Sequence, residues 1–208
     1  MLTLYDFLDS GNGYKCRLLL AQLGLPFRLV LKDILKGETR TEEFLKLNPN
    51  GRIPVLVLED GRALAESGAI LCYLAEGTPF LPEDRFEHAQ ALHWLFFEQY
   101  SHEPYIAVAR FWRHFVWAEK AGDPYWERAL AERMEHGHQA LAVMQRHLAR
   151  HAYLAAERYT VADIALYAYT HVAEEGGFDL SDYPAVRAWL DRVADQPGHV
   201  LMTQSDFP

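Results

Sequence analysis

Residues 53–65 read Ile53-Pro54-Val55-Leu56-Val57-Leu58-Glu59-Asp60-Gly61-Arg62-Ala63-Leu64-Ala65. Val55-Leu56-Val57-Leu58 is apolar at every position, which is typical of a central strand that is buried on both faces. Glu59-Asp60-Gly61-Arg62 has the composition of a hairpin turn, so Ala63-Leu64-Ala65 is predicted to form a second, short strand. This pair of strands predicts a β-sheet in the first third of the chain.

The residues around this stretch alternate strand-like and helix-like segments. Leu2–Phe7 is short and apolar-rich, and Phe27–Leu31 alternates apolar and polar side chains, so both predict strands. Cys16–Leu23 repeats apolar side chains at the spacing of a buried helix face. Further short helices are predicted at Thr41–Leu47 and from Ser67 to about Glu76. This order of strands and helices contains two types of connection within one sheet, so the sheet is predicted to be mixed, with helices covering it.

Gly77-Thr78-Pro79-Phe80-Leu81-Pro82 interrupts the pattern, and every later segment has helical periodicity. We therefore predict an α/β domain over residues 1–77 and an all-α bundle over residues 84–208. Pro104 lies inside the first long helical segment and predicts a kink there. The apolar positions of the predicted helices are Leu92, Leu95, Phe96, Val108, Phe111, Trp112, Phe115, Met134, Leu141, Leu148, Val161, Ile164, Ala165, Ala168, Val186, Trp189, Leu190 and Val193.

Composition and charge exclude several classes of function. The formal net charge of −9 argues against binding nucleic acid, because a protein that neutralises phosphates carries excess positive charge. No apolar run is long enough to span a membrane, and residues 1–6 do not resemble a signal peptide, so we expect a cytoplasmic protein. The two cysteines, Cys16 and Cys72, have no metal spacing and favour a reducing compartment. The ten histidines are scattered, with His136 and His138 the closest local pair, and predict no metal site.

Three stretches together resemble the glutathione transferase superfamily, and the resemblance covers nearly the whole chain. They are Ser10-Gly11-Asn12-Gly13-Tyr14-Lys15, then Asn48-Pro49-Asn50-Gly51-Arg52-Ile53-Pro54 with Glu66-Ser67 twelve residues beyond Pro54, and Tyr159-Thr160-Val161-Ala162-Asp163-Ile164. The bacterial enzymes with a serine or threonine at the start of the first helix, and Asn two residues on, are the most similar. The resemblance implies a thioredoxin-like N-terminal domain, an all-α C-terminal domain and a homodimer.

The resemblance implies that Ser10 and Asn12 are catalytic. Glutathione has a thiol whose pKa is near that of free cysteine, so only a small part is nucleophilic thiolate at neutral pH. A hydroxyl that donates a hydrogen bond to the sulfur stabilises the thiolate, and so does the N-terminus of a helix. Ser10 stands where both effects meet, and the Asn12 amide can add a second donor.

Other interpretations of these residues stay open at this point. Ser10 can be an ordinary helix N-cap, a position that serine often fills. Tyr5 is a rival hydroxyl, because other branches of the family use a tyrosine at the end of the first strand; its alternative role is a core-facing sheet residue. Cys16 lies on an apolar helix face and is favoured as a core thiol.

The remaining glutathione contacts are implied at Arg52, Ile53, Pro54, Glu66 and Ser67. A cis bond before Pro54 is implied, so that the backbone of Ile53 pairs with the cysteinyl unit of glutathione. Ser67 and the start of its helix suit the γ-glutamyl carboxylate, Glu66 the ammonium group, and Arg52 the glycyl carboxylate. Glu66 and Ser67 are expected at the far end of the site from the sulfur. Each residue also has a plain structural role: strand-initiating proline, helix cap, solvated arginine.

The second substrate and the reaction are less determined by the sequence. Tyr105 and Arg110, near Pro104, are the candidates for contacting an electrophilic or disulfide substrate. Conjugation and glutathione-dependent disulfide reduction need the same thiolate, and a non-catalytic ligand carrier or partner subunit is the alternative from another class. Related bacterial enzymes often carry Gln near Thr39, so one glutathione contact is expected to be missing. Thr160–Asp163 is a helix-capping motif that we assign to folding.

Overall fold

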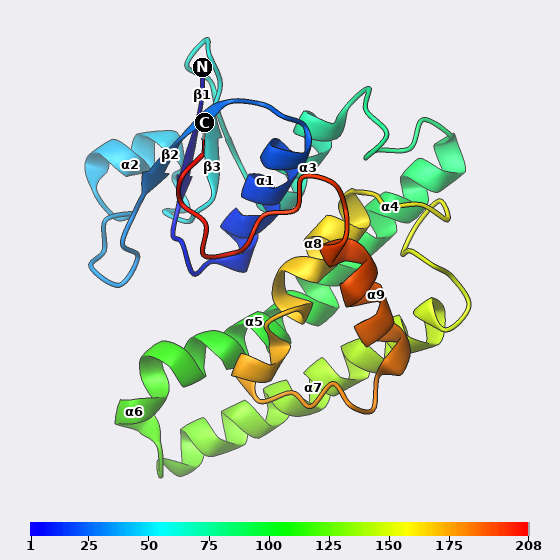
Figure 1. Cartoon of the computed structure of the whole chain (residues 1–208). Coiled ribbons are helices and arrows are strands. Elements are labelled where there is room, and N and C mark those ends of the chain that lie inside the picture. Colours follow the sequence, from blue (N-terminus) through cyan, green and yellow to red (C-terminus); the bar gives the residue numbers. More distant parts are fainter. Residues whose placement is uncertain (208) are drawn as a thin grey trace. The chain divides into compact units, whose positions relative to one another are not determined.

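The computed structural model describes residues 1–207 (Figure 1). The chain divides into two compact units, one formed by Met1–Thr78 together with the residues from Gln196 on, the other by Pro79–Asp195. The final segment, which the sequence-based domain boundaries place with the bundle, thus packs with the first unit. Within residues 1–207, no helix combines the length and the apolar composition that crossing a membrane requires.

The first unit is a four-stranded mixed sheet with helices on both faces, as expected for a thioredoxin-like domain. The strand order is β2-β1-β3-β4, with β1 parallel to β2 and antiparallel to β3, and β3 antiparallel to β4. Its elements are β1 (Leu2–Asp6), α1 (Gly11–Gln22), β2 (Phe27–Leu31), α2 (Glu42–Leu47), β3 (Val55–Val57), β4 (Ala63–Ala65) and α3 (Ser67–Ala75).

The two faces of this sheet are covered by different helices. Asp6 of β1 forms an ion pair with Arg17 of α1, and α1 packs beside α3 (Figure 1). The ring of Tyr5, the preceding residue of β1, packs edge-on against Phe44 of α2, with ring centroids 6.0 Å apart. Because successive side chains of a strand point to opposite faces, α1 and α2 cover opposite sides of β1.

The regular elements of the second unit are all helices. Its elements are α4 (Arg85–Phe97), η1 (Glu98–His102), α5 (Glu103–Phe111), η2 (Trp112–Val116), α6 (Trp117–Lys120), α7 (Pro124–Leu148), α8 (Val161–Thr170), η3 (Ala173–Gly176) and α9 (Pro184–Ala194). Its core combines buried side chains of α5, α7, α8 and the segment after α8, among them Ile106, Leu141 and Phe178.

The break predicted at Pro104 takes the form of a π-helix. Segment η1 ends at His102, and Pro104 lies in the first turn of α5, where its missing N–H is tolerated. A second π-helix, η2, follows α5 and was not predicted, because no proline or glycine marks it. Single π-turns of this kind occur inside longer helical runs.

The start of α8 is held by the predicted capping motif. Asp163 is fully buried and accepts hydrogen bonds at both oxygens. Oδ2 accepts from the backbone N–H and the hydroxyl of Thr160, at 2.9 and 3.2 Å. Oδ1 accepts from the Leu154 N–H and the Trp189 Nε1–H, at 3.0 and 2.9 Å. The motif therefore joins the cap of α8 to the preceding loop and to α9.

Candidate functional site

Ser10 is the N-cap of α1, and its hydroxyl can serve a ligand at the same time. Its Oγ accepts a hydrogen bond from the Gly13 N–H at 3.3 Å, and its own N–H donates to the Phe7 carbonyl at 2.8 Å. No acceptor for the Ser10 hydroxyl hydrogen is found among residues 1–207. The capping role uses the oxygen as an acceptor, so the hydrogen remains available for donation toward a ligand.

The rival hydroxyl, Tyr5, lies on the other side of the sheet. Its ring contacts Phe44 of α2, and the ammonium group of Lys32 lies 6.0 Å from the ring centroid. Asp6, the next residue, faces α1, whose N-cap is Ser10. Tyr5 therefore points away from the face on which α1 begins.

Asn12, Lys15 and Ser67 form a polar cluster between α1 and the start of α3. The Lys15 ammonium donates to Asn12 Oδ1 at 2.7 Å and lies 3.4 Å from the Ser67 hydroxyl, which itself donates to Asn12 Oδ1 at 3.2 Å. Lys15 is 1 % exposed and Ser67 is 4 % exposed. The structure thus brings together Asn12 and Ser67, which the sequence analysis placed at opposite ends of the site.

Glu66 connects β4 to α3 in an uncommon backbone conformation. Its φ is +69°, a region that residues with a Cβ rarely adopt and that costs about 1–3 kcal/mol. The Glu66 side chain is exposed and makes no capping hydrogen bond to α3. The carboxylate consequently stands at the surface beside Ser67.

The loop before β3 presents backbone groups without partners. The Ile53–Pro54 bond is cis, as the resemblance implies. Neither the N–H nor the carbonyl of Ile53 forms a hydrogen bond within residues 1–207. Arg52 is exposed, and its carbonyl accepts from the Asn48 side chain at 2.8 Å. Such an unpaired segment can accept a short peptide as an added strand.

The two thiols do not contribute a nucleophile to this cluster. Cys16 is fully buried, as expected, and burial raises the pKa of its thiol well above its ordinary range. Cys72 is half-buried in α3, and its thiol pKa is also raised by burial and by Glu76. Both stay protonated at neutral pH.

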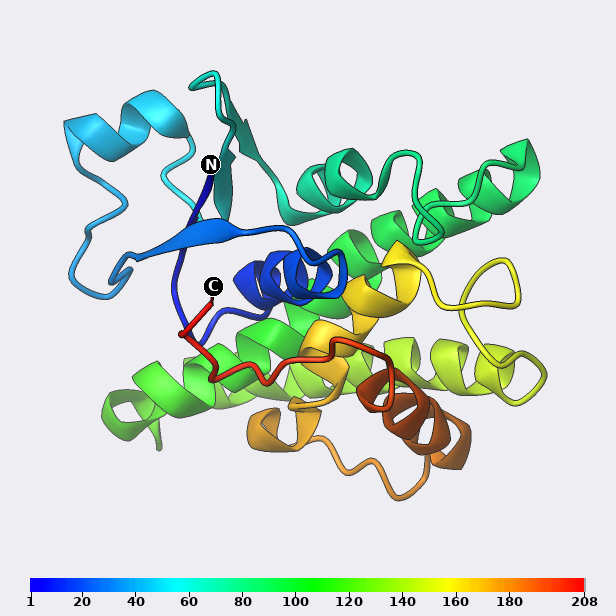
Figure 2. The ribbon, with the colours of Figure 1, turned by 45° about the horizontal axis from the view of Figure 1, so that its top comes forward.

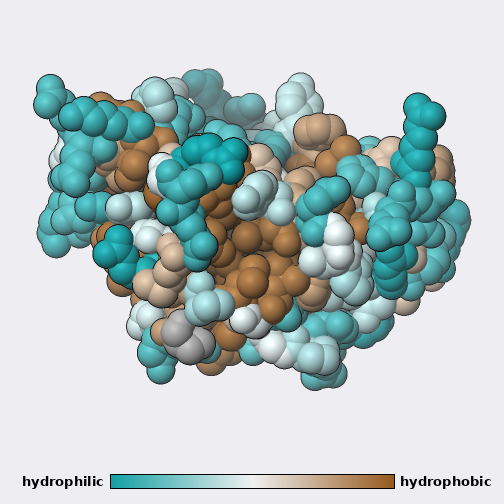
Figure 3. Space-filling model, turned by 90° about the horizontal axis from the view of Figure 1, so that it is seen from above, coloured by the Kyte–Doolittle hydropathy of each residue, from teal (hydrophilic) through white to brown (hydrophobic). Residues whose placement is uncertain are grey.

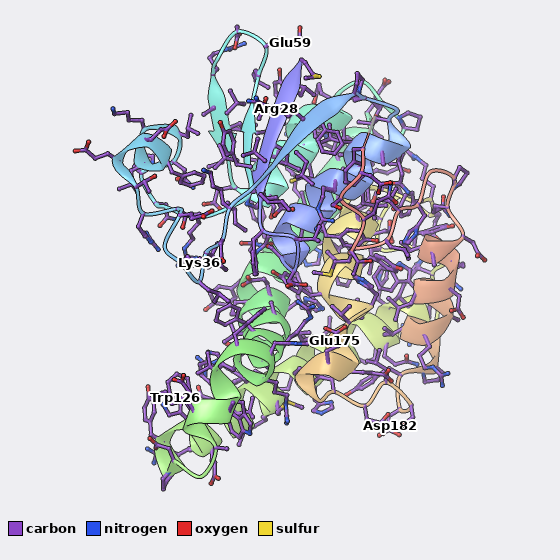
Figure 4. All side chains as sticks on the ribbon, turned by 60° about the vertical axis from the view of Figure 1, so that its left-hand side comes forward. Arg28, Lys36, Glu59, Trp126, Glu175 and Asp182 are labelled. Atoms are coloured by element: carbon purple, nitrogen blue, oxygen red, sulfur yellow. The ribbon has the colours of Figure 1, made fainter. Side chains whose placement is uncertain are left out.

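In the second unit, Tyr105 and Arg110 occupy different surroundings. Tyr105 stacks at a tilt on His136, with ring centroids 4.8 Å apart, and lines a pocket of about 290 Å³. The other lining residues are Phe97, Tyr100, Ser101, Gln139, Ala140 and Val143. Arg110 does not line this pocket. It is buried and donates at 2.5 Å to Glu175, which lies on η3 (Figure 4).

Comparisons with known proteins identify the family of the chain. Residues 1–76 match the model of the glutathione S-transferase N-terminal domain, and residues 105–197 match that of the C-terminal domain. A solved structure of a glutathione S-transferase from Pseudomonas fluorescens Pf-5 is 52 % identical, with a TM-score of 0.92 over 98 % of this chain and 99 % of that one. The chain belongs to the glutathione S-transferase family.

Two other similar proteins have a named activity or a bound ligand. The disulfide-bond oxidoreductase YfcG of Escherichia coli K12 is 35 % identical over 95 % of this chain and 92 % of its own length. The glutathione transferase URE2P8 of Phanerochaete chrysosporium, solved with oxidized glutathione, is 26 % identical, with a TM-score of 0.83 over 95 % of this chain and 90 % of that one.

Two basic residues of this chain were assigned no role from the sequence. Lys15 and Arg17 are fully buried although both carry charge, and both lie on α1. The available signal was a pair of cations inside an otherwise apolar helix, because a charged side chain is almost never fully buried without a partner. Thr39, near which the resemblance implies a Gln in related bacterial enzymes, is also buried, so its short side chain does not reach the surface.

Proposed function

We propose that this chain binds glutathione in its first unit and that the Ser10 hydroxyl donates a hydrogen bond to the glutathione sulfur, holding it as a thiolate. The observation that carries the proposal is the Ser10 hydroxyl itself. Its oxygen caps α1 through the Gly13 N–H, while its hydrogen has no acceptor within residues 1–207. The site stands at the N-terminus of a twelve-residue helix, where negative charge is stabilised.

The magnitudes are sufficient for this task. Lowering the pKa of a thiol by about two requires about 2.7 kcal/mol of preferential stabilisation of the thiolate. A hydrogen bond to a charged acceptor supplies about 1.5–3 kcal/mol, and the helix N-terminus adds about 0.3–2 kcal/mol. Asn12 is the second proposed catalytic residue, as a donor to the same sulfur through its amide.

The rest of the tripeptide is assigned to groups already described. The unpaired backbone of Ile53, next to Pro54, pairs with the cysteinyl unit. The γ-glutamyl carboxylate binds at Ser67 and the start of α3, where the buried Lys15 cation adds positive charge. Glu66 binds the ammonium group, and Arg52 binds the glycyl carboxylate.

The thiolate attacks either an electrophilic carbon or a disulfide. Attack on carbon joins glutathione to the substrate and either displaces a leaving group with its electron pair or adds across a double bond, whose electron pair then takes up a proton. In attack on a disulfide the thiolate forms a mixed disulfide and releases the other sulfur as a thiolate. The similarity to YfcG, a disulfide-bond oxidoreductase, favours disulfide reduction as the second candidate function. Tyr105 and Arg110 remain the proposed contacts for the second substrate. Tyr105 lines the aromatic pocket. Arg110 lies outside that pocket and is paired with Glu175, so Tyr105 is the better supported of the two. A non-catalytic carrier remains the alternative, and it predicts binding without a lowered thiol pKa.

Ser10→Ala is expected to lower turnover by about 10–1,000-fold, because it removes about 1.5–4 kcal/mol of thiolate stabilisation. The affinity for glutathione should change little. The measurement is the ultraviolet absorbance of the bound thiolate against pH, combined with steady-state turnover. Tyr5→Phe is the matched control, since Tyr5 faces α2. Full activity in Ser10→Ala, together with loss of activity in Tyr5→Phe, would show that Tyr5 and not Ser10 donates to the sulfur.

Glu66→Gln and Ser67→Ala are expected to differ in kinetics. Glu66 is exposed and contacts only an unreacting group of glutathione, so its loss should raise KM by about 10–150-fold with little change in kcat. Ser67 also donates to Asn12, so its loss should lower kcat as well. Steady-state kinetics with glutathione varied at saturating second substrate separates the two. A kcat unchanged in Ser67→Ala would contradict the assigned coupling to Asn12.

We also propose a homodimer that works in the reducing cytoplasm. Figure 3 shows apolar side chains gathered on the face seen from above. In the first unit the exposed Met1, Leu25 and Tyr73 line a hollow of about 730 Å³, a kind of surface that often marks a protein interface. Sedimentation at micromolar concentration should give twice the chain mass; a 23.9-kDa species would contradict the proposal.

A further inference from the structure

Arg17 is a fully buried cation whose guanidinium group joins three parts of the first unit. Its Nε donates to Asp6 Oδ2 of β1 at 2.8 Å. One Nη donates to the Leu8 carbonyl at 2.7 Å. The other donates to the carbonyls of Met202 and Gln204, at 2.6 and 3.2 Å. One side chain thus connects the sheet, the loop before α1 and the end of the chain.

The loop that Arg17 contacts carries Ser10. Leu8 precedes Ser10 by two residues, and the Ser10 N–H donates to the carbonyl of Phe7. The Phe7 N–H in turn donates to Asp6 Oδ1 at 2.7 Å. Asp6 therefore fixes the loop through the Phe7 N–H, and Arg17 fixes it through the Leu8 carbonyl. Burial raises the pKa of Asp6 to about 6, so this carboxylate is still ionised at neutral pH.

The final segment is attached to α1 and β2 at further points. Tyr14, also fully buried, donates its hydroxyl to the Val200 carbonyl at 2.7 Å, and the same hydroxyl lies 3.2 Å from His199 Nε2. The ring of Phe207 packs on Phe27 of β2, with centroids 4.8 Å apart. Figures 1 and 2 both show this segment, in red, running alongside α1.

We propose that Arg17 is a positioning residue for Ser10 and that residues 196–207, anchored by Tyr14, keep the guanidinium group in place. The inference rests on the function proposed for Ser10. A hydrogen bond weakens steeply as its distance and angle depart from the optimum, so a small shift of the loop weakens donation to the sulfur. Arg17 touches no reacting atom; it acts through the Leu8 carbonyl.

Two variants test this without removing any part of the chain. Arg17→Lys keeps the positive charge beside Asp6 but replaces a planar group with several donors by a single ammonium, which cannot reach all four acceptors. Tyr14→Phe removes only the hydroxyl that anchors Val200 and leaves Asp6 and Arg17 unchanged. Arg28→Lys is the control, because Arg28 is exposed on β2 (Figure 4).

The readout is the pKa of the bound glutathione thiol, from thiolate absorbance, together with the pH profile of kcat. Arg17→Lys is expected to raise that pKa by about 0.5–1, which lowers the thiolate fraction by about 3–10-fold at pH values below it. Activity should recover at higher pH, and KM for glutathione should stay within about two-fold. Tyr14→Phe should shift the same profile in the same direction by less, and Arg28→Lys not at all.

A purely structural role for Arg17 would lower thermal stability and leave the thiol pKa unchanged, which would overturn the proposal. If Arg17→Lys does not fold, Tyr14→Phe decides the question through the same profile. If Ser10→Ala raises the thiol pKa while Arg17→Lys and Tyr14→Phe do not, the positioning role fails and the Ser10 function stands. If Ser10→Ala also leaves the pKa unchanged, the proposed function itself fails.

Discussion

An alanine at position 13 is expected to lower the free energy of unfolding by more than about 3 kcal/mol and to remove most activity. A Cβ on Gly13 would lie 1.6 Å from Asp6 Oδ1 and 2.0 Å from its Cγ. Asp6 cannot move aside easily, because Arg17 and the Phe7 N–H hold both of its oxygens. Overpacking of a rigid site costs about 1–3 kcal/mol, and more where the neighbours cannot yield.

The loss of activity follows because Gly13 also donates its N–H to Ser10 Oγ. Any displacement that relieves the clash moves that donor or the Asp6–Arg17 pair. Gly68→Ala is the matched control, since no atom lies within 4 Å of a Cβ there and alanine favours a helix over glycine. The melting temperature should fall by about 6–12 °C in Gly13→Ala and stay unchanged in Gly68→Ala. Equal melting temperatures for the two variants would show that the Asp6 side chain is not rigidly held.

Asp163→Asn is expected to destabilise the protein by about 2–4 kcal/mol, because an amide keeps only one acceptor oxygen. Four hydrogen bonds from Leu154, Thr160 and Trp189 now reach the two carboxylate oxygens. The amide nitrogen has to face at least one buried N–H, which is left unsatisfied. Denaturant unfolding measures the change. Asp182→Asn, at an exposed aspartate (Figure 4), should stay within about 0.5 kcal/mol of the parent chain.

The cost of Asp163→Asn is also expected to depend on pH. Burial raises the pKa of Asp163 from 3.8 to about 6, against the hydrogen bonds that lower it. Between these two values the folded state binds a proton more readily than the unfolded state, so the parent chain gains stability as pH falls from 7 to 5. The asparagine variant has no such proton to bind. The difference in free energy of unfolding between the parent chain and Asp163→Asn should therefore be larger at pH 5 than at pH 7. A smaller difference at pH 5 would show that the hydrogen bonds lower the pKa of Asp163 by more than burial raises it.

The parts of this fold that depend on neighbours in sequence were predictable. The capping motif Thr160–Asp163, the turn at Gly61 and the helix covering Cys16–Leu23 each follow from residues within a few positions of one another. The family motifs added the cis bond before Pro54, which no local pattern distinguishes from an ordinary trans proline.

Contacts between distant residues were not predictable. Ser67 and Asn12 are 55 residues apart, so spacing alone says nothing about their hydrogen bond. The pairing of Arg17 with the carbonyls of Met202 and Gln204 spans almost the whole chain. The π-helix η2 contains no proline or glycine, so no local sequence signal marks it.

The attachment of the last residues to the first unit has a consequence for synthesis on the ribosome. The chain leaves this unit after Thr78 and returns only at Gln196, with 117 residues between. At about 5–20 residues per second, the ribosome needs roughly 6–23 s to make them. For that interval the guanidinium group of Arg17 lacks two of its carbonyl acceptors, so the part that is translated first is the part that is completed last.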